Sequence, residues 1–491
     1  MLDTVTLSRA VTRIAGRDPR GGNGVRLLRD AAENYPAWLE AIRGAKSYVH
    51  FENFIVADDR AGRLFADALM ERARAGIPVR VLYDWLGCTG RSGAAYWSEL
   101  IEAGVDVRVF NPLRLSAPLW IRRDHRKVIV VDGTLAFVSG LCVSNDWTGT
   151  ENGTVAPWRD TGVAVRGPAA ADVDAAFAET WALCGEPLPA QERPDADFVE
   201  PVGDVPVRVV AGRPGELGTY RLDLLMAASA RKRLWLTDAY MMPTPAYVRA
   251  LSEAARDGVD VRLLVPGSSD VPFLQPFVRM GYRPLIDGGV RVFEWNGSML
   301  HAKTAVIDGR WSRVGSTNLN MTSWFTNWEI DVAIEDAEFA AGMEAMYLED
   351  LANATEVVAT GRIRARMAKA PKSGRPVGRA ARRIATSAIG LGATVGAALS
   401  GSRSLTAMEA RSIAPVGLAL LALAALVTIF PFLLVSPLVI WLVWTAAALM
   451  GRAWRSKLPR RAQERRWWGV AGRRAEPVVM PREREGRREG S

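Results

Sequence analysis

The sequence predicts an α/β protein made of two similar domains, each with a mixed β-sheet flanked by helices, followed by a helical hairpin in a membrane. Three observations lead to this prediction. Residues 1–360 are internally duplicated, each copy carries the same short motif, and a run of 40 residues near the C-terminus contains no charge. The 491 residues are enough for two or more domains.

The duplication takes the form of matching strand and helix patterns. Each copy has a strand, a helix with apolar residues at helical spacing, a glycine and another β-branched strand. The matching segments are 45–56 with 231–242, 68–85 with 250–267, and 103–112 with 288–296. We therefore expect a first half at 1–185 and a second half at 207–360, joined by the Pro-rich linker 186–206.

Lysine usage supports the duplication. Residues 1–360 contain four lysines, and arginine carries most of the other basic charge. Alignment of the first strands of the two copies matches Lys46 with Lys232. A later motif matches Lys127 with Lys303. These positions therefore favour lysine over arginine.

That later motif reads H-x-K-x4-D-G in both copies. Its residues are His125, Lys127 and Asp132 in the first copy and His301, Lys303 and Asp308 in the second. Residues i and i+2 of a strand point to the same face, so each histidine should project with its lysine. The apolar residues that follow predict a buried strand, and Asp-Gly predicts the turn after it.

Two facing copies would bring two imidazoles and two ammonium groups into one small site at the interface of the halves. Two ammonium groups suit a phosphodiester anion. One imidazole can attack phosphorus while the other protonates the leaving oxygen. A single such motif would be read as a structural histidine, but two copies in a repeat indicate a catalytic pair. His, Cys and carboxylate residues show no ligand spacing, so no metal and no cofactor are expected.

With these motifs, the sequence resembles the phospholipase D superfamily, and specifically the bacterial cardiolipin synthases, over residues 25–350. The second copy also has Gly315-Ser316-Thr-Asn318, then Ser323 and Asn327-Trp-Glu329, which resemble the family's motif extension. The segments VRVLYDWLG and PWRDTGVAVRGPAA resemble the cardiolipin synthase branch more than the nucleases.

The resemblance implies a two-step transfer through a phosphohistidine intermediate. We take His125 as the nucleophile and His301 as the acid and base, an assignment that the near-symmetry of the motifs leaves open to reversal. Lys127, Lys303 and Asn318 would hold the phosphoryl oxygens, with Ser316 nearby.

Other residues are expected to support this machinery. Asp132 and Asp308 would support their own motifs or a histidine. Glu329 would orient an imidazole, the alternative being a surface carboxylate. Two further carboxylates, Glu52 and Asp238, are expected at equivalent places on the first strands, facing the site or packed elsewhere.

The first copy departs from the second at one polar position. Cys142 stands where the second copy has Asn318, and Asn145 is the candidate to replace the missing amide. A further histidine, His50, has Leu236 opposite it in the second half and is expected to be a packed core residue.

The C-terminal region carries the basic charge. Residues 361–491 contain 24 basic and six acidic residues, a net charge of +18, which leaves −9 for residues 1–360 out of the overall +9. An acidic body is a poor electrostatic partner for nucleic acid, so none is expected to bind. Basic flanks at 361–411 and 452–491 suit anionic lipid headgroups.

The uncharged run 412–451 predicts a membrane hairpin, divided by Pro431 and Pro437. Because both flanks are basic, both ends should stay on the cytoplasmic side. One long kinked span and a buried soluble hairpin are the alternatives. We expect a bacterial inner-membrane protein with its catalytic body on the cytoplasmic side.

The expected reaction joins two phosphatidylglycerols into cardiolipin and glycerol, so anionic phospholipid and membrane are the expected partners. Hydrolysis by water, or transfer to another alcohol, uses the same residues and is the first alternative. A nuclease is disfavoured by the acidic body, and an inactive membrane scaffold by the intact histidines and lysines of both motifs.

Overall fold

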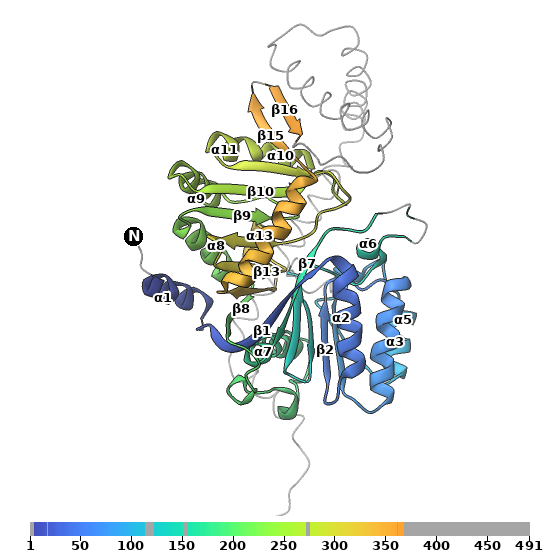
Figure 1. The fold of residues 1–491 in the computed structure, drawn as a ribbon. Coiled ribbons are helices and arrows are strands. Elements are labelled where there is room, and N and C mark those ends of the chain that lie inside the picture. Colours follow the sequence, from blue (N-terminus) through green and yellow to red (C-terminus); the bar gives the residue numbers. More distant parts are fainter. Residues whose placement is uncertain are drawn as a thin grey trace, which may run out of the picture. The chain divides into compact units, whose positions relative to one another are not determined.

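The computed structural model describes residues 4–16, 18–112, 122–150, 153, 156–271, 275–360 and 362–367. They belong to one compact unit, Met1–Lys372, drawn in colour in Figure 1. Within these ranges no helix is long and apolar enough to cross a bilayer. The expected hairpin at 412–451, its basic tail and all but a short strand of the basic linker lie outside the described residues.

The first half alternates strands and helices as predicted. Its elements are α1 (Thr4–Ala15), β1 (Arg20–Arg29), α2 (Asp30–Gly44), β2 (Val49–Asn53), α3 (Arg60–Arg74), β3 (Val79–Asp84), α4 (Trp85–Cys88), α5 (Ala94–Glu102), β4 (Asp106–Phe110), β5 (Lys127–Val131), β6 (Leu135–Ser139), α6 (Asn145–Thr148), β7 (Thr161–Arg166) and α7 (Pro168–Leu183). The short helices η1 (Ala190–Glu192) and η2 (Ala196–Phe198) follow in the expected linker.

The second half repeats this order and then adds a hairpin. Its elements are β8 (Val205–Gly212), α8 (Gly218–Ser229), β9 (Arg233–Thr237), α9 (Pro245–Arg256), β10 (Asp260–Pro266), α10 (Gln275–Met280), α11 (Tyr282–Asp287), β11 (Arg291–Trp295), β12 (Thr304–Ile307), β13 (Trp311–Gly315), α12 (Met321–Phe325), β14 (Glu329–Ile334), α13 (Ala337–Ala352), β15 (Ala354–Thr360) and β16 (Arg362–Met367).

The strands form one mixed sheet where two were expected. Its 16 described strands run in the order β16-β15-β11-β10-β9-β12-β13-β14-β8-β1-β7-β6-β5-β2-β3-β4 (Figure 1). The two halves join where β1 pairs antiparallel with β8, with Asn23 opposite Val205. Within each half three strands are parallel, β2-β3-β4 and β9-β10-β11, as strand–helix–strand connections require.

The aspartate that ends each motif shows how the copies correspond. Asp132 accepts hydrogen bonds from the backbone N–H groups of residues 46–48 at 2.7–3.2 Å. Asp308 accepts equivalent bonds from residues 231–233 at 2.8–3.0 Å. The backbone N–H of Asp132 also donates to the carbonyl of Tyr48, and the backbone N–H of Asp308 donates to the carbonyl of Arg233. Tyr48 therefore corresponds to Arg233.

This correspondence corrects the sequence alignment of the first strands by one residue. β2 pairs Glu52 with Val128, whereas β9 pairs Thr237 with Thr304, and Val128 and Thr304 both follow the motif lysine. Glu52 therefore corresponds to Thr237 and not to Asp238. A shift of one residue moves every side chain to the other face of a strand, so Glu52 and Asp238 face different surroundings.

The same offset affects two other pairs. Lys46 corresponds to Arg231 and not to Lys232, and the counterpart of His50 is Trp235 and not Leu236. His50 is buried as expected of a core residue. However, its ring lies between two carboxylates, with its Nδ1 2.6 Å from Asp174 and its Nε2 3.2 Å from Glu192 of the linker.

The core of the unit extends across both halves. One apolar cluster contains Val138 and Val163 from the first half together with Val209, Val332 and Ala340 from the second. Helix α7 packs on strands β5 to β8 and on β1, and α13 packs on β1 and on strands of the second half. Because this shared core fixes one half against the other, residues of both halves can meet in one site.

Candidate active site

The two motif histidines lie on loops that are paired, residue by residue, with the opposite half. A parallel bridge joins Asp124 to Trp328, and the N–H of His125 donates to the carbonyl of Trp328 at 2.9 Å. A second parallel bridge joins Arg159 to Leu300, and the N–H of His301 donates to the carbonyl of Arg159 at 2.7 Å. Each motif is therefore placed by backbone hydrogen bonds from the other copy.

Each histidine is also held by a carboxylate from the other half. His125 Nδ1 lies 2.9 Å from Glu329 Oε2, and His301 Nδ1 lies 2.8 Å from Asp160 Oδ2. Both carboxylates are fully buried. Because a carboxylate only accepts hydrogen bonds, each Nδ1 carries the proton and each Nε2 keeps a free lone pair.

Asp160 was missed from the sequence, although a signal for it was present. Gly162 on β7 pairs with the last residue of β6, and Asp331 on β14 pairs with the last residue of β13, which holds the same position in the second copy. The segment from Arg159 to Val165 therefore aligns with the segment from Trp328 to Ile334. This alignment places Asp160 at the position of Glu329. The two copies therefore use carboxylates of different length for the same task.

Each carboxylate has its own supports. Glu329 accepts hydrogen bonds from the Ser316 hydroxyl at 2.6 Å and from the Asn327 amide at 3.3 Å. Asp160 accepts from the indole N–H of Trp147 at 2.9 Å. Gly140 stands where the second copy has Ser316, and a Cβ there would lie 2.3 Å from Asp160 Oδ1. Glycine is therefore required for Asp160 to approach this closely.

The two motif lysines lie beside their histidines, and both are almost fully buried. Each Nζ donates to the backbone carbonyl of its own histidine, and Lys303 Nζ also lies 2.9 Å from His301 Nδ1. Since that Nδ1 donates to Asp160, the Lys303 ammonium acts on the imidazole as a charge and not as a donor. The charges of Lys127 and Lys303 act on each other and on both histidines, so the two motifs converge.

Burial and this concentration of positive charge change the ionisation of the site. Burial, together with the nearby Lys303 ammonium, lowers the pKa of His301 to about 4. Burial also lowers the pKa of Lys303 to about 8 and lowers the pKa values of His125 and Lys127. Both imidazoles are therefore neutral near pH 7 in the absence of a bound anion.

The polar position next to the motifs differs between the copies. Asn318 is buried, its backbone N–H lies 3.3 Å from the Ser323 hydroxyl, and its Oδ1 has no hydrogen-bond partner. Cys142 occupies the matching place in the first copy and is also buried. The side chain of Asn145, the candidate to replace the missing amide, accepts the N–H of Ala61 at the start of α3 through its Oδ1.

Four of the expected supporting carboxylates lie away from the imidazoles. Asp132 and Asp308 sit beyond the far ends of β5 and β12 and hold backbone turns. Glu52 accepts a hydrogen bond from Thr180 on α7. Asp238 accepts from the N–H groups of Tyr240 and Leu319 at 3.0 and 2.7 Å, and thereby fixes loops near Lys303. Among the described residues, no cluster of His, Cys or carboxylate side chains could hold a metal ion.

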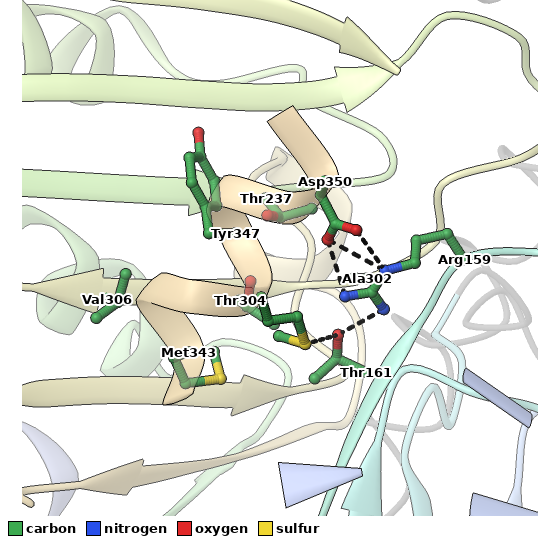
Figure 2. A pocket seen from close by; sticks show the side chains of 10 residues that line it. Arg159, Thr161, Thr237, Ala302, Thr304, Val306, Met343, Tyr347 and Asp350 are labelled. Atoms are coloured by element: carbon green, nitrogen blue, oxygen red, sulfur yellow. Dashed lines mark hydrogen bonds and ion pairs between the residues drawn. The ribbon is translucent and has the colours of Figure 1, made fainter. Parts of the chain in front are cut away.

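Arg159 fixes the strand that carries Asp160. Its buried guanidinium contacts Asp350 of α13 at 2.8–3.1 Å and the Thr161 hydroxyl at 3.0 Å (Figure 2). It also contacts Asp30 at 3.1 Å. The small pocket in Figure 2 also includes Ala302 and Thr304, which alternate with His301 and Lys303 along the chain. The pocket therefore lies on the opposite side of the segment that leads into β12 from the side chains of His301 and Lys303.

We expect Arg159→Gln to reduce both stability and turnover. Loss of the guanidinium leaves Asp350 buried with a weakened ion pair, which should lower the free energy of unfolding by about 3 kcal/mol. It also loosens the backbone that places Asp160 against His301. Denaturant titration and turnover per folded molecule would measure the two effects. The matched control is Arg208→Gln. Arg208 lies on β8, is also buried, and its guanidinium pairs with Glu335 at 3.0 Å. Equal turnover losses in the two variants would contradict the expectation.

Comparison with known families agrees with this geometry. The family described as "Cardiolipin synthase, PLD-like domain" matches residues 38–181 and 224–351, which include both motifs. Cardiolipin synthase A of Pseudomonas fluorescens is 34% identical over 71% of this chain and 73% of its own length. Cardiolipin synthase of a Geobacillus species is 31% identical over 68% of this chain and 67% of its own length. For cardiolipin synthase 2 of Bacillus anthracis, the match spans 65% of that protein.

Solved structures share the fold at low sequence identity. Phosphatidylserine synthase from Haemophilus influenzae superposes with a TM-score of 0.55 at 15% identity, covering 72% of this chain and 92% of that one. Polyphosphate kinase from Porphyromonas gingivalis superposes with a TM-score of 0.50 at 15% identity, covering 74% of this chain and 52% of that one. The family model and the sequence relatives show that the chain belongs to the cardiolipin synthase family of phospholipase D-like proteins.

Proposed function

We propose that the protein is a phosphatidyltransferase that converts two phosphatidylglycerols into cardiolipin and glycerol through a phosphohistidine. Family membership supports the reaction class. The observation that carries the mechanism is the pair of buried imidazoles, each with Nδ1 fixed by a carboxylate and Nε2 free. One imidazole supplies a nucleophile and the other transfers a proton, which is what phosphoryl transfer between two alcohols requires.

In the first step, His125 Nε2 attacks the phosphorus of one phosphatidylglycerol. A phosphorus–nitrogen bond forms as the phosphorus–oxygen bond to glycerol breaks, and His301 gives its proton to the departing glycerol oxygen. The bound phosphodiester is negative, so it offsets the repulsion from Lys303 and raises the pKa of His301 relative to the empty site. His301 is therefore protonated when the leaving oxygen needs its proton.

In the second step, the terminal hydroxyl of another phosphatidylglycerol gives its proton to neutral His301. Its oxygen attacks phosphorus, the phosphorus–nitrogen bond breaks, and cardiolipin leaves with His125 restored. Protons balance over the cycle, because His301 gains the proton that it lost. Lys127 and Lys303 balance the charge on the phosphoryl oxygens throughout, and the side-chain amide N–H groups of Asn318 can donate to these oxygens.

We expect His125→Ala and His301→Ala each to abolish cardiolipin formation, because both steps use both imidazoles. Purified protein incubated with vesicles of labelled phosphatidylglycerol would be analysed for cardiolipin, glycerol and phosphatidic acid. Cardiolipin with glycerol supports the transferase, and phosphatidic acid alone would indicate a hydrolase. His50→Gln is the matched control, since the His50 ring bonds Asp174 and Glu192 and neither of the motif histidines. Normal synthesis by either motif variant would refute the paired mechanism.

The reaction should weaken at alkaline pH. The pKa of Lys303 lies near 8 in the empty protein, so its positive charge is lost as the pH rises through that value. Because kcat/KM reports the free enzyme, kcat/KM should fall above about pH 8. Lys303→Arg keeps its charge and should move this limb to higher pH. A wild-type profile that stays level to pH 10 would contradict the role given to Lys303.

We also propose that the uncharged run 412–451 anchors the protein as a hairpin in the bacterial inner membrane, with the catalytic body on the cytoplasmic side. The basic flanks at 361–411 and 452–491 support this orientation. Cysteines introduced between Pro431 and Pro437 should react with an impermeant reagent from outside the cell if the hairpin spans the bilayer. Reactivity of cysteines in the basic flanks from outside would refute the orientation.

A further inference from the structure

The two histidines differ in the aromatic side chains beside them. Around His301 lie the rings of Trp147, Trp158 and Tyr240, with centroid distances of 5.3, 5.7 and 5.9 Å. Beside His125 lies the ring of Phe54, at 4.9 Å. Trp147 is buried, whereas Trp158 and Tyr240 are half-buried and present part of their surface to solvent. The side of the site next to His301 is therefore aromatic and still accessible.

Polar groups from both halves complete this side. The Tyr240 hydroxyl donates to both carboxylate oxygens of Asp270, at 2.8 and 2.9 Å, and Asp270 is exposed. Arg91 of the first half pairs with Asp146 and lies near enough to Asp270 for their charges to interact. The N–H of Trp158 in turn donates to the carbonyl of Asp146 at 3.0 Å. These contacts hold the aromatic and acidic groups in one place.

We propose that Trp158, Tyr240 and Asp270 form a binding site for the glycerol group of the alcohol that leaves or enters next to His301. The inference rests on the proposed function, in which His301 exchanges a proton with that alcohol. Small-molecule sites combine aromatic walls with a few fixed polar groups. The carbon edge of a polyol lies against the rings, and its hydroxyls donate to the Asp270 carboxylate or to the hydroxyl oxygen of Tyr240.

The two steps of the reaction make one such site sufficient. The departing glycerol and the glycerol headgroup of the second lipid occupy the same position, because the second step is the reverse of the first with a different alcohol. A site that hydrogen-bonds several hydroxyls binds a polyol in preference to water, which offers no carbon edge and no second hydroxyl. This site therefore favours transfer over hydrolysis.

The test compares Tyr240→Phe and Asp270→Asn with the wild-type protein on phosphatidylglycerol vesicles. Each variant weakens hydrogen bonds to the alcohol, so cardiolipin formation should fall about tenfold, as expected for about 1.4 kcal/mol of lost binding. Both products pass through the same first step, so the ratio of cardiolipin to phosphatidic acid is the decisive readout, and it should fall because water does not use the site in the second step. Tyr220→Phe is the matched control, because the Tyr220 hydroxyl bonds Thr244 at 2.8 Å and contacts neither motif.

A second measurement separates the two sources of the glycerol group. Incorporation of labelled free glycerol into phosphatidylglycerol reports the leaving alcohol, whereas cardiolipin formation reports the lipid headgroup, and both should fall together in the variants. If the wild-type protein makes cardiolipin but the variants keep its ratio of cardiolipin to phosphatidic acid, the proposed glycerol site is overturned and the proposed function stands. A wild-type protein that makes no cardiolipin would overturn the proposed function as well.

Discussion

The hydrogen bonds that His125 donates to Glu329 and that His301 donates to Asp160 are the interactions on which the rest of the structure depends. Each crosses between the halves, so neither half by itself contains a motif histidine together with its carboxylate. Both carboxylates are fully buried, and a buried charge is tolerated only when it is well paired. The continuous sheet through β1 and β8 and the apolar core shared by both halves hold these pairs in register.

The duplicated site is asymmetric, and its differences compensate one another. The short side chain of Asp160 reaches His301 because Gly140 leaves room beside it. The longer Glu329 leaves space in which Ser316 donates a hydrogen bond. A serine at position 140 would collide with Asp160, and a glycine at 316 would remove a donor from Glu329. The two copies therefore could not exchange single residues without loss, although their motifs are the same.

The sequence predicted the duplication, the strand and helix order and the catalytic motifs, because these depend on local periodicity and on rare residue types. It did not predict the single sheet, since the β1–β8 pairing joins segments nearly 200 residues apart. The one-residue error in matching Glu52 to Asp238 arose because apolar strands look alike when shifted. Asp160 was missed because its role depends on a contact across the halves, and only alignment with Glu329 could have pointed to it.

The site places two lysines and two histidines together inside a body whose net charge is −9. Burial disfavours the charged form of these groups and the two ammonium groups repel each other and protonation of the imidazoles, so the pKa values of His301 and Lys303 are lowered in the empty site. A phosphodiester relieves the repulsion, so substrate binding and proton uptake by the site are coupled. A neutral ligand of the same shape would leave the repulsion in place. The site therefore selects anionic substrates as much by the strain of its empty state as by the contacts it offers.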